Sequence, residues 1–273
     1  MKDLKKHIGE AVDDIRLVTD AQPKIGIILG TGLGGLVDKI DIEHTVSYEN
    51  IKHFPLSTVE GHAGRLIFGK LAGKSIVAMQ GRFHYYEGYT MKQVTFPVRV
   101  MKALGINTLI VSNACGGMNP QFKAGDMMII TDHINLQTEN PLRGYNDPDL
   151  GDRFPDVSRI YDRELVALAE QCALDLKIKV QKGVYVSVMG PNFETAAEYR
   201  FLRIIGADAV GMSTVPEVLV AHHQKTRVLG LSIITDMGLP DCLEQTSHEI
   251  ILKNAAVAEA KMTAVAEAVV AKL

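Results

Sequence analysis

The stretch Lys24-Ile-Gly-Ile-Ile-Leu-Gly30 is a continuous apolar run that stops at a glycine. Such a run is typical of a strand that is buried on both faces, and strands of that kind belong to α/β folds in which helices cover the sheet. Outward from this run, further strand patterns alternate with helical patterns, and neither a linker nor an internal repeat interrupts them. The sequence therefore predicts a single α/β domain, residues 1–273, with a largely buried sheet. Further strands are predicted at 65–69, 74–80, 108–113, 127–134, 180–189 and 228–235.

Helices are predicted where apolar residues recur at a spacing of three or four. The first twenty residues carry such a stripe, which predicts an amphipathic surface helix. The last helix is predicted to begin at Thr246-Ser-His-Glu249, which has the pattern of a capping box. Residues 135–158 show no periodicity, and an irregular stretch of that length in a compact chain is usually functional. The remaining helices are predicted at 91–104, 163–175, 195–205 and 215–225.

The composition is that of an ordinary globular protein. Of the 273 residues, 47% are hydrophobic and 22% are charged, which excludes a disordered chain. The net charge is −3 and there is no basic run, so we expect no nucleic-acid partner. No apolar run approaches the ~18–20 residues of a membrane span, and no apolar signal core follows Met1–His7, so we expect neither membrane insertion nor export. The three scattered cysteines, Cys115, Cys172 and Cys242, suit reduced thiols in the cytoplasm.

The first predicted strand leads into the glycine-rich loop Gly30-Thr-Gly-Leu-Gly-Gly35. Glycines at a strand end let backbone N–H groups turn toward an anion, and Thr31 adds a hydroxyl donor. The loop also satisfies G-x-G-x-x-G, so a Rossmann-type nucleotide site is the first rival. Against it, the helix that follows, to about Ile40, is short, and no strand ending in an acidic residue lies ~20 residues on. A glycine turn required only for packing explains the same residues.

A second candidate is Gly81-Arg-Phe-His-Tyr-Tyr-Glu-Gly88, which follows another predicted strand. Arg82 and His84 lie two residues apart, so on an extended segment they point to the same side. The guanidinium offers a planar fork of donors that suits phosphate oxygens. Glu87 is placed to orient one of these two side chains. Together these residues predict an anion clamp.

Two further glycine-rich segments support or extend this anion site. Gly61-His-Ala-Gly-Arg65 makes His62 a weaker candidate, because the same residues suit a simple turn. Asn113-Ala-Cys-Gly-Gly117 offers more backbone N–H groups at a strand end. Cys115 has no histidine beside it in sequence, so a small buried thiol is a better interpretation than a nucleophile. Two glycine loops and an arginine favour one phosphate-sized anion.

The second half of the chain supplies side chains suited to a flat polar ring. Phe193 is a stacking candidate, and Glu194 either accepts hydrogen bonds from ring N–H groups or caps the following helix. Asp236 directly follows the last strand, where it can take or share a proton. His248, at the start of the final helix, can donate to a ligand hydroxyl.

The segment Val210-Gly-Met-Ser-Thr-Val-Pro-Glu217 adds Ser213, which can reach the anion, and Met212, which either lines a sugar site or packs in the core. No metal site is predicted. His222 and His223 are adjacent on a predicted helix and diverge, so we expect them on the exposed surface. No nucleophile elbow of the Gly-x-Ser-x-Gly kind is present.

These motifs, in this order from about residue 24 to about residue 249, resemble the trimeric class of purine nucleoside phosphorylases. The resemblance implies a mixed central β-sheet surrounded by helices, a homotrimer and the reversible phosphorolysis of purine (deoxy)ribonucleosides, with phosphate as co-substrate and no cofactor. The motifs are Gly30–Gly35, Gly61–Arg65, Gly81–Tyr89, Asn113–Gly117, Asn140-Pro-Leu-Arg-Gly144, Gly151-Asp-Arg-Phe-Pro155, Gly190–Thr195 and Ala207–Glu217.

The resemblance also assigns residues to subsites. Phe154, within the irregular segment, is expected to complete the site of the neighbouring subunit. Phosphate is expected at Thr31, His62, Arg82, His84, the Ala114 backbone N–H and Ser213. The sugar is expected near Tyr86, Met212 and His248, and the base near Phe193, Glu194 and Asp236. The residues expected to act in catalysis are His84, Glu87, Asp236 and His248.

The sequence departs from the family pattern at Asp236, where inosine and guanosine phosphorylases usually carry asparagine. A carboxylate can only accept hydrogen bonds, which suits the 6-amino group of adenine. Glu194 suits the N1–H of a 6-oxopurine instead. Either Asp236 is protonated, its pKa raised by burial and by Glu194, or base selectivity is relaxed. We predict activity on 6-oxopurine nucleosides, with acceptance of adenosine left open by Asp236.

Two alternatives remain at this point. Methylthioadenosine phosphorylase is a related enzyme that also prefers aspartate at position 236, but Gly81–Tyr89 and Glu194 resemble the nucleoside enzymes instead. The alternative of a Rossmann-type nucleotide-binding protein is supported by the Gly30–Gly35 motif alone.

Overall fold

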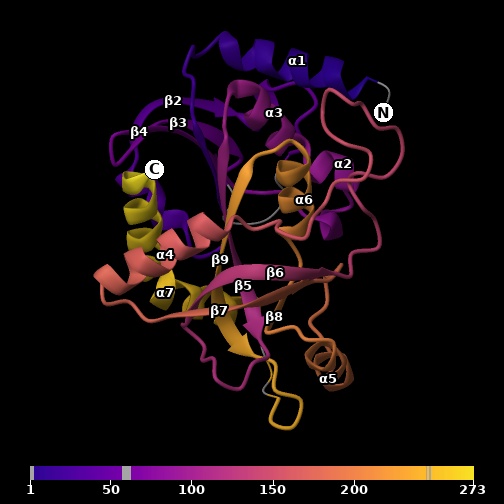
Figure 1. The fold of residues 1–273 in the computed structure, drawn as a ribbon, viewed down its shortest axis with the longest axis vertical. Coiled ribbons are helices and arrows are strands. Elements are labelled where there is room, and N and C mark those ends of the chain that lie inside the picture. Colours follow the sequence, from indigo (N-terminus) through magenta and orange to yellow (C-terminus); the bar gives the residue numbers. More distant parts are fainter. Residues whose placement is uncertain (1–2, 57–62, 244, 246) are drawn as a thin grey trace.

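A mixed β-sheet runs through the whole molecule (Figure 1). The computed structural model describes residues 3–56, 63–243, 245 and 247–273. Within these residues nine strands form one sheet in the order β2-β3-β4-β1-β5-β8-β7-β6-β9, with a further pairing between β5 and β9. The strands are β1 Ile25–Leu29, β2 Asp41–Ser47, β3 Arg65–Leu71, β4 Lys74–Gln80, β5 Thr108–Gly117, β6 Met127–Asn135, β7 Val180–Ser187, β8 Ala209–Gly211 and β9 Arg227–Met237.

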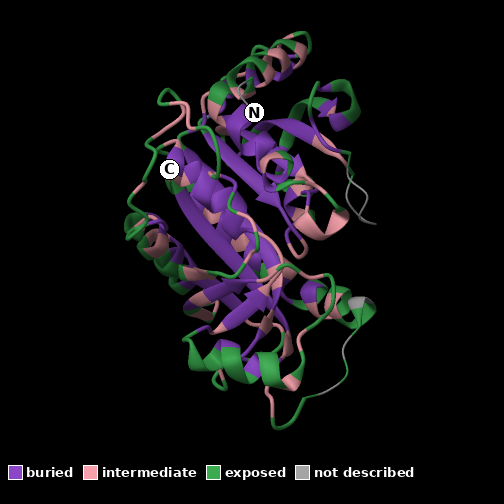
Figure 2. Cartoon of the chain, turned by 90° about the vertical axis from the view of Figure 1, so that its right-hand side faces the viewer, coloured by how far each residue is buried: buried purple, intermediate pink, exposed green. Residues whose placement is uncertain are grey.

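Helices cover both faces of the sheet, and the central strands between them are buried (Figure 2). One apolar core is shared with α1, α3 and α6, and a second core is shared with α4, α7 and η1. The helices are α1 Leu4–Arg16, α2 Met91–Val94, α3 Phe96–Leu104, α4 Arg163–Asp175, α5 Ala196–Ile204, α6 Val215–His223 and α7 His248–Lys272, with 3-10 helices η1 Gly34–Lys39, η2 Tyr48–Asn50 and η3 Tyr85–Glu87.

β1 lies in the middle of the sheet because all five of its residues are buried. It pairs in parallel with β4 on one side and with β5 on the other. Ile28 packs into the core beneath α1, α3 and α6, whereas Ile27 and Leu29 pack into the core beneath α4 and α7. The alternation confirms that Lys24–Gly30 forms a strand covered on both faces.

Five of the strands close into a ring. β5 pairs with β8, β8 with β7, β7 with β6 and β6 with β9, and β9 returns to pair with β5. The β5–β8 and β6–β9 pairs are antiparallel and the other three are parallel, so the mixed sheet is confirmed. Closure removes strand edges from this half of the sheet, while the other half ends at the mostly exposed β2.

Two strands and one helix boundary differ from the sequence prediction. β2 is mostly exposed and β8 has only three residues, so neither carries a recognisable strand pattern. The predicted helix 91–104 is two helices, α2 and α3, with Pro97 in the first turn of α3. Proline lacks the N–H that a continuous helix would use there.

Two more predictions need correction. The segment 113–117, predicted as a loop, is the last part of β5, where it pairs with both β8 and β9. The final helix is capped by Ser247, whose hydroxyl accepts a hydrogen bond from the Ile250 N–H at 3.3 Å. The predicted capping box began one residue earlier, at Thr246, which lies outside the described residues. The irregular segment 135–158 is confirmed, since no helix or strand separates β6 from α4.

Candidate active site

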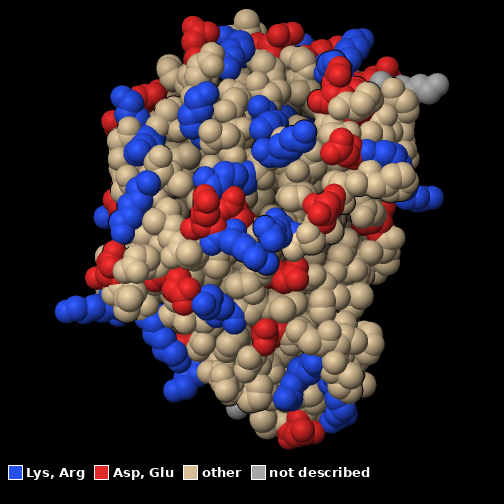
Figure 3. Space-filling model, viewed as in Figure 1, with Lys and Arg blue, Asp and Glu red and all other residues tan. Residues whose placement is uncertain are grey.

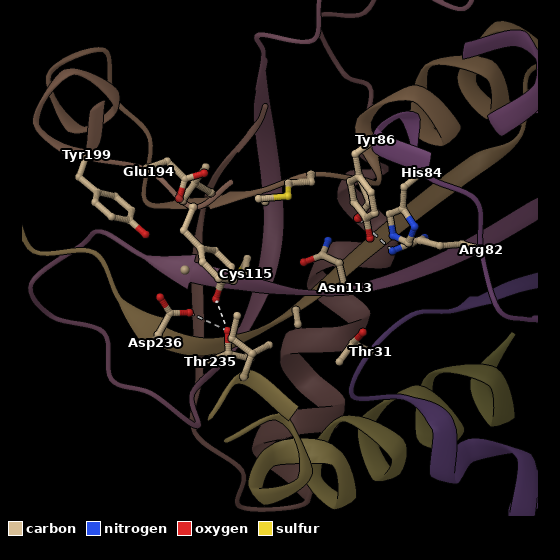
Figure 4. Close-up of a pocket in the computed structure, with 18 residues that line it drawn as sticks. Thr31, Arg82, His84, Tyr86, Asn113, Cys115, Glu194, Tyr199, Thr235 and Asp236 are labelled. Carbon is tan, nitrogen blue, oxygen red and sulfur yellow. Dashed lines mark hydrogen bonds between the residues drawn. The ribbon is translucent and has the colours of Figure 1, made fainter. Parts of the chain in front are cut away.

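A solvent-accessible pocket lies where β1, β4, β5 and β9 end. Its two ends differ in chemistry (Figure 4). Arg82, His84 and Tyr86 lie at one end, and Glu194 and Asp236 lie at the other. The lining residues are Thr31, Arg82, His84, Tyr86, Asn113–Gly116, Phe193, Glu194, Tyr199, Val210–Ser213, Thr235, Asp236 and Ile251.

Arg82 is the centre of the cationic end. Its side chain is 2% exposed and forms an ion pair with the equally buried Glu217, with Nη2–Oε2 3.1 Å and Nε–Oε1 3.2 Å. Its Nη1 donates to the Ser112 carbonyl at 2.6 Å and to the Ser213 hydroxyl at 3.1 Å. A buried charge needs such partners, because its loss of hydration must be compensated. The arginine is therefore held rigidly beside Ser213.

Gly30 allows β1 and β5 to approach at this end of the pocket. A Cβ at position 30 would lie 2.2 Å from the Ser112 carbonyl oxygen and 2.9 Å from Arg82 Nη1. The Gly30 N–H donates to Ser112 Oγ at 3.0 Å, which in turn donates to the Ile28 carbonyl at 3.1 Å. The glycine of the first loop is thus required by close packing around the arginine, whatever anion binds there.

Ser213 is presented by a strained turn before α6. Thr214 has φ 70° and ψ −55°, and the Val215 N–H donates to the Ser213 carbonyl at 2.8 Å. This is a γ-turn with positive φ, a rare and strained conformation. The Asn113 amide fixes it by donating to the Thr214 hydroxyl at 2.8 Å. Strain of this kind is common at functional sites, where the surrounding structure enforces it.

His84 is oriented by Glu87. The His84 Nδ1 lies 2.9 Å from Glu87 Oε1, and the same oxygen accepts the His84 backbone N–H at 2.7 Å. Tyr86 stacks on the imidazole with ring centroids 4.6 Å apart. Burial lowers the pKa of His84, and the carboxylate of Glu87 opposes that shift. Of the two options for Glu87, orienting His84 is what the structure shows.

The acidic end carries two carboxyl groups that are hard to ionise. Burial raises the pKa of Asp236, and the hydrogen bond from Thr235 Oγ1 at 2.9 Å opposes the shift (Figure 4). Burial also raises the pKa of Glu194, and the negative charge of Asp236 adds to that rise. Both groups therefore keep a proton to higher pH than an exposed carboxyl group does.

Most of the predicted site residues meet in this pocket, as the residues that line it show. Glu87 lies behind His84, and Phe154 lies on the surface, where its side chain is 87% exposed. His62 lies outside the described residues, and His248 begins α7 without a described side chain. Ten predicted residues line the pocket: Thr31, Arg82, His84, Tyr86, Ala114, Phe193, Glu194, Met212, Ser213 and Asp236.

Sequence reasoning missed several residues that build the site. Glu217 holds Arg82, yet its position in the first turn of a helix gives no sign of that partnership. Tyr199 lies on α5 and lines the acidic end. Asn113 could have been predicted, because it is a polar residue at the end of the apolar run of β5. Thr235 precedes Asp236 and contacts its carboxyl group.

Two histidine predictions and one cysteine prediction can be checked. His223 was expected to be exposed but is 4% exposed, and its Nε2 lies 3.1 Å from the Asp152 carbonyl oxygen. His222 Nε2 lies 2.7 Å from the Asp156 carbonyl oxygen. Both rings therefore hold the irregular segment. Cys115 is 4% exposed and burial raises the pKa of its thiol, which confirms a packing role.

A histidine and glutamate cluster that the sequence did not predict lies on the α1 side of the molecule. The ligating atoms of His7, Glu10 and His53 lie within 4.8 Å of one another. His53 Nε2 is 2.6 Å from Glu10 Oε2, and its ring stacks on that of His7 at 3.9 Å between centroids. None of the three lines the strand-end pocket.

The comparisons with known proteins agree with this geometry. A family model described as the phosphorylase superfamily matches residues 24–271. Purine nucleoside phosphorylase 1 of Bacillus subtilis (strain 168) is 54% identical over 269 residues, which are 98% of this chain and 99% of that protein. The chain belongs to the purine nucleoside phosphorylase family.

Other members of the purine nucleoside phosphorylase family extend the likeness. The enzyme of Bos taurus is 52% identical, over 86% of this chain and 84% of that protein. Crystal structures of Schistosoma mansoni purine nucleoside phosphorylase in complex with adenosine and of schistosoma purine nucleoside phosphorylase in complex with hypoxanthine match with TM-scores of 0.93 and 0.94. Each is 41% identical and covers 98% of this chain and 97% of that one.

Membership of the purine nucleoside phosphorylase family excludes the Rossmann alternative. The loop after β1 leads into the 3-10 helix η1, not into the α-helix of a dinucleotide-binding unit. The relatives compared above are named purine nucleoside phosphorylases, not methylthioadenosine phosphorylases. On the face seen in Figure 3, basic and acidic residues are interspersed, in keeping with the net charge of −3. In the described part of the chain, no helix is both long enough and apolar enough to cross a membrane.

Proposed function

We propose that the chain catalyses the reversible phosphorolysis of purine ribonucleosides and deoxyribonucleosides, yielding the free base and (deoxy)ribose 1-phosphate. One observation carries this proposal: a single pocket has a rigid arginine with hydroxyl groups at one end and two protonatable carboxyl groups at the other. An oxyanion and a polar heterocycle can be bound there together, with a sugar between them. The membership of the family supports the same reaction.

For the phosphate we propose the cationic end of the pocket. Arg82 supplies charge, Ser213 and Thr31 supply hydroxyl donors, and the strand-end backbone supplies the Ala114 N–H. All four residues line the pocket, which supports this assignment. His84, held by Glu87, is proposed as a further partner of the phosphate, and His62 keeps this role as a prediction.

For the nucleoside we propose the remaining part of the pocket. In this proposal Phe193 stacks on the purine, and Tyr86 and Met212 contact the sugar. His248 donates a hydrogen bond to a sugar hydroxyl. Tyr86 lines the pocket and stacks on His84 beside the proposed phosphate position, which supports its assignment. The reaction as proposed uses phosphate as co-substrate and needs neither a cofactor nor a metal ion.

The reaction then proceeds without a covalent enzyme intermediate. The bond between C1′ and N9 breaks as a phosphate oxygen forms its bond to C1′, so positive charge builds on the sugar and negative charge on the purine. The bound phosphate stabilises the first charge. A proton held at the acidic end and donated toward N7 stabilises the second charge, which is electrostatic stabilisation of the transition state. Holding both reactants in one pocket removes their translational freedom.

The raised pKa values at the acidic end bear on the choice of base. A protonated Asp236 can donate to N7, whereas an ionised one can only accept, for example from a 6-amino group. We propose that 6-oxopurine nucleosides are the better substrates and that adenosine is also accepted. The schistosome relatives, crystallised with adenosine and with hypoxanthine, support acceptance of both kinds of base.

We further propose a homotrimer in which Phe154 completes the site of the neighbouring subunit. A phenyl ring that is 87% exposed, with Arg153 over it at 5.6 Å, is poorly placed for a role in its own chain. We place the reaction in the cytoplasm, for which the three free cysteines are the support.

The test is a comparison of kcat/KM for inosine, guanosine, adenosine and methylthioadenosine at saturating phosphate. We expect inosine and guanosine to exceed adenosine, and adenosine to exceed methylthioadenosine. A preference for methylthioadenosine would overturn the proposal in favour of the related enzyme class.

A further inference from the structure

A second, smaller cavity lies on the side of the sheet covered by α1, α3 and α6. Its wall is formed by these helices, by α2 and by the segment 141–150, which run close together at one end of the molecule (Figure 1). Its charged and titratable lining residues are Lys5, Lys92, Arg99, Tyr145, Asp147 and His223. We call it the α3 cavity. None of the described residues that we propose for the phosphate site lines it.

Arg99, on α3, is the unusual residue of the α3 cavity. Its side chain is 6% exposed, and its Nη1 is buried without a hydrogen-bond partner among the described residues. Burial lowers its pKa to about 10, and no neighbouring carboxylate opposes that shift. Arg82 is buried still more deeply, but it has Glu217, Ser112 and Ser213 as partners. Among the described residues, one buried guanidinium therefore has a carboxylate partner and the other has none.

Two described acids near the α3 cavity have partners other than Arg99. The Asp147 carboxylate accepts the Asp149 backbone N–H at 3.0 Å within its own turn. Asp149 forms an ion pair with the exposed Lys5. A second cation, Lys92, lies close to Gly144. A Cβ atom at position 144 would be only 3.2 Å from Lys92 Nζ, so the glycine leaves space for the ammonium group. In the part of the chain that the structure describes, Arg99 therefore has no carboxylate partner.

An uncompensated buried charge is costly, whereas the same charge beside an anion is not. A guanidinium presents paired N–H donors at the spacing of tetrahedral oxyanion oxygens, and an ammonium adds a point charge. We propose that the α3 cavity is a second oxyanion site, in which Arg99 and Lys92 bind inorganic phosphate or a similar small tetrahedral anion. This site is separate from the strand-end pocket and does not depend on the proposed function.

The first experiment locates the anion in the unaltered protein. Crystals are soaked in selenate, whose selenium is identified by anomalous scattering. We expect one peak beside Arg99 and another beside Arg82. A peak beside Arg82 alone overturns the second site and leaves the proposed function intact. A peak beside Arg99 alone supports the second site and counts against the proposed phosphate position. The absence of both peaks overturns both.

The second experiment counts phosphate ions in solution by isothermal titration calorimetry. Arg99→Met should bind one phosphate per chain fewer than the unaltered protein and keep the same KM for phosphate in phosphorolysis. Removal of an unpaired buried charge should leave folding intact, since methionine fills similar space. Arg163→Met is the matched control, because Arg163 is exposed on α4, and it should bind as the unaltered protein does.

Two results in solution would overturn the second site. One is Arg99→Met binding as much phosphate as the unaltered protein. The other is a change of oligomeric state in Arg99→Met, seen by sedimentation, which would identify a carboxylate of a neighbouring copy as the missing anion. The selenate experiment decides the question without a variant if Arg99→Met does not fold.

Discussion

Asp236 is the residue at which base selectivity is decided in this account. Its carboxyl group faces the pocket with a raised pKa, next to Glu194, whose pKa is also raised. An ionised aspartate accepts from a 6-amino group, whereas an asparagine can donate to a 6-oxo group. The two carboxyl groups share one end of the pocket, so the proton count of the pair sets which base fits.

The first prediction concerns Asp236→Asn and the ratio of kcat/KM for inosine to that for adenosine. We expect the ratio to rise by about tenfold or more. One well-placed hydrogen bond contributes about 1.4 kcal/mol, and that free energy corresponds to a tenfold change in the ratio. Steady-state assays with both nucleosides measure it. An unchanged ratio would show that Asp236 does not select the base.

The second prediction follows from the raised pKa of Asp236 in the folded state. A carboxyl group of this kind stabilises the fold below its ordinary pKa, about 4, and that contribution is lost as pH rises through the raised value. Relative to the unaltered protein, Asp236→Asn should therefore gain stability as pH increases from about 4 toward neutral. Thermal unfolding across that range measures the difference. Exposed Asp38→Asn should show no such trend.

The third prediction concerns Glu217, which holds Arg82. Glu217→Gln leaves a buried guanidinium without its countercharge, so the free energy of unfolding should fall by about 3–5 kcal/mol. The KM for phosphate should rise, because Arg82 loses its fixed position. Denaturant unfolding and phosphate saturation curves measure the two effects. Exposed Glu49→Gln should change unfolding by less than about 0.5 kcal/mol. Normal stability in Glu217→Gln would refute the proposed role of the ion pair.

At the scale of elements, α6 links the two parts of the proposed site. Its first turn carries Glu217, and the turn before it carries Ser213, both beside Arg82, while its last two residues contact the irregular segment. His223 Nε2 lies against the Asp152 carbonyl and His222 Nε2 against the Asp156 carbonyl. These two contacts fall two residues before and two residues after Phe154.

The fourth prediction tests His222 as a positioning residue for Phe154. His222→Leu should raise the KM for inosine about fivefold, with kcat and the KM for phosphate little changed, since one hydrogen bond is worth about 1 kcal/mol. His222→Gln keeps an amide donor and should restore the KM. The prediction is wrong if the glutamine and leucine variants behave alike, because packing alone would then explain the effect.

Local sequence patterns predict individual helices and strands better than they predict contacts between distant segments. β1 and the glycine at position 30 follow from an apolar run and its end, both visible within seven residues. The pairing of β5 with β9, which closes the ring of five strands, joins segments more than a hundred residues apart. No local sequence pattern predicts this pairing. The β8 strand is too short to carry a period of two.

The same division holds for the candidate site. Residues directly after strands were predicted, because strand ends in α/β sheets collect at the ligand site. Glu217 could not be predicted as the partner of Arg82, since a buried arginine needs an acid but the sequence does not say which acid folds against it. Phe154 rests on the family resemblance alone, because its contacts lie outside its own chain in the proposed trimer.

At the scale of the whole molecule, the fifth prediction is that the protein is a trimer with shared sites. Sedimentation should give about three times the chain mass of 29.8 kDa. Phe154→Ala and Glu194→Ala should each be weak enzymes. Mixed and reassembled, they should regain activity, because some intact pockets then meet an intact Phe154 from a neighbour. No recovery in verified mixed trimers would mean that Phe154 serves no neighbouring site.

The central claim is that one pocket binds phosphate and a purine nucleoside together and joins phosphate to the sugar. The most direct measurement follows inosine in the presence and absence of inorganic phosphate and quantifies hypoxanthine, ribose 1-phosphate and free ribose. The account predicts equal amounts of hypoxanthine and ribose 1-phosphate, formed only when phosphate is present. Release of hypoxanthine with free ribose at a rate independent of phosphate would contradict it and identify a hydrolase.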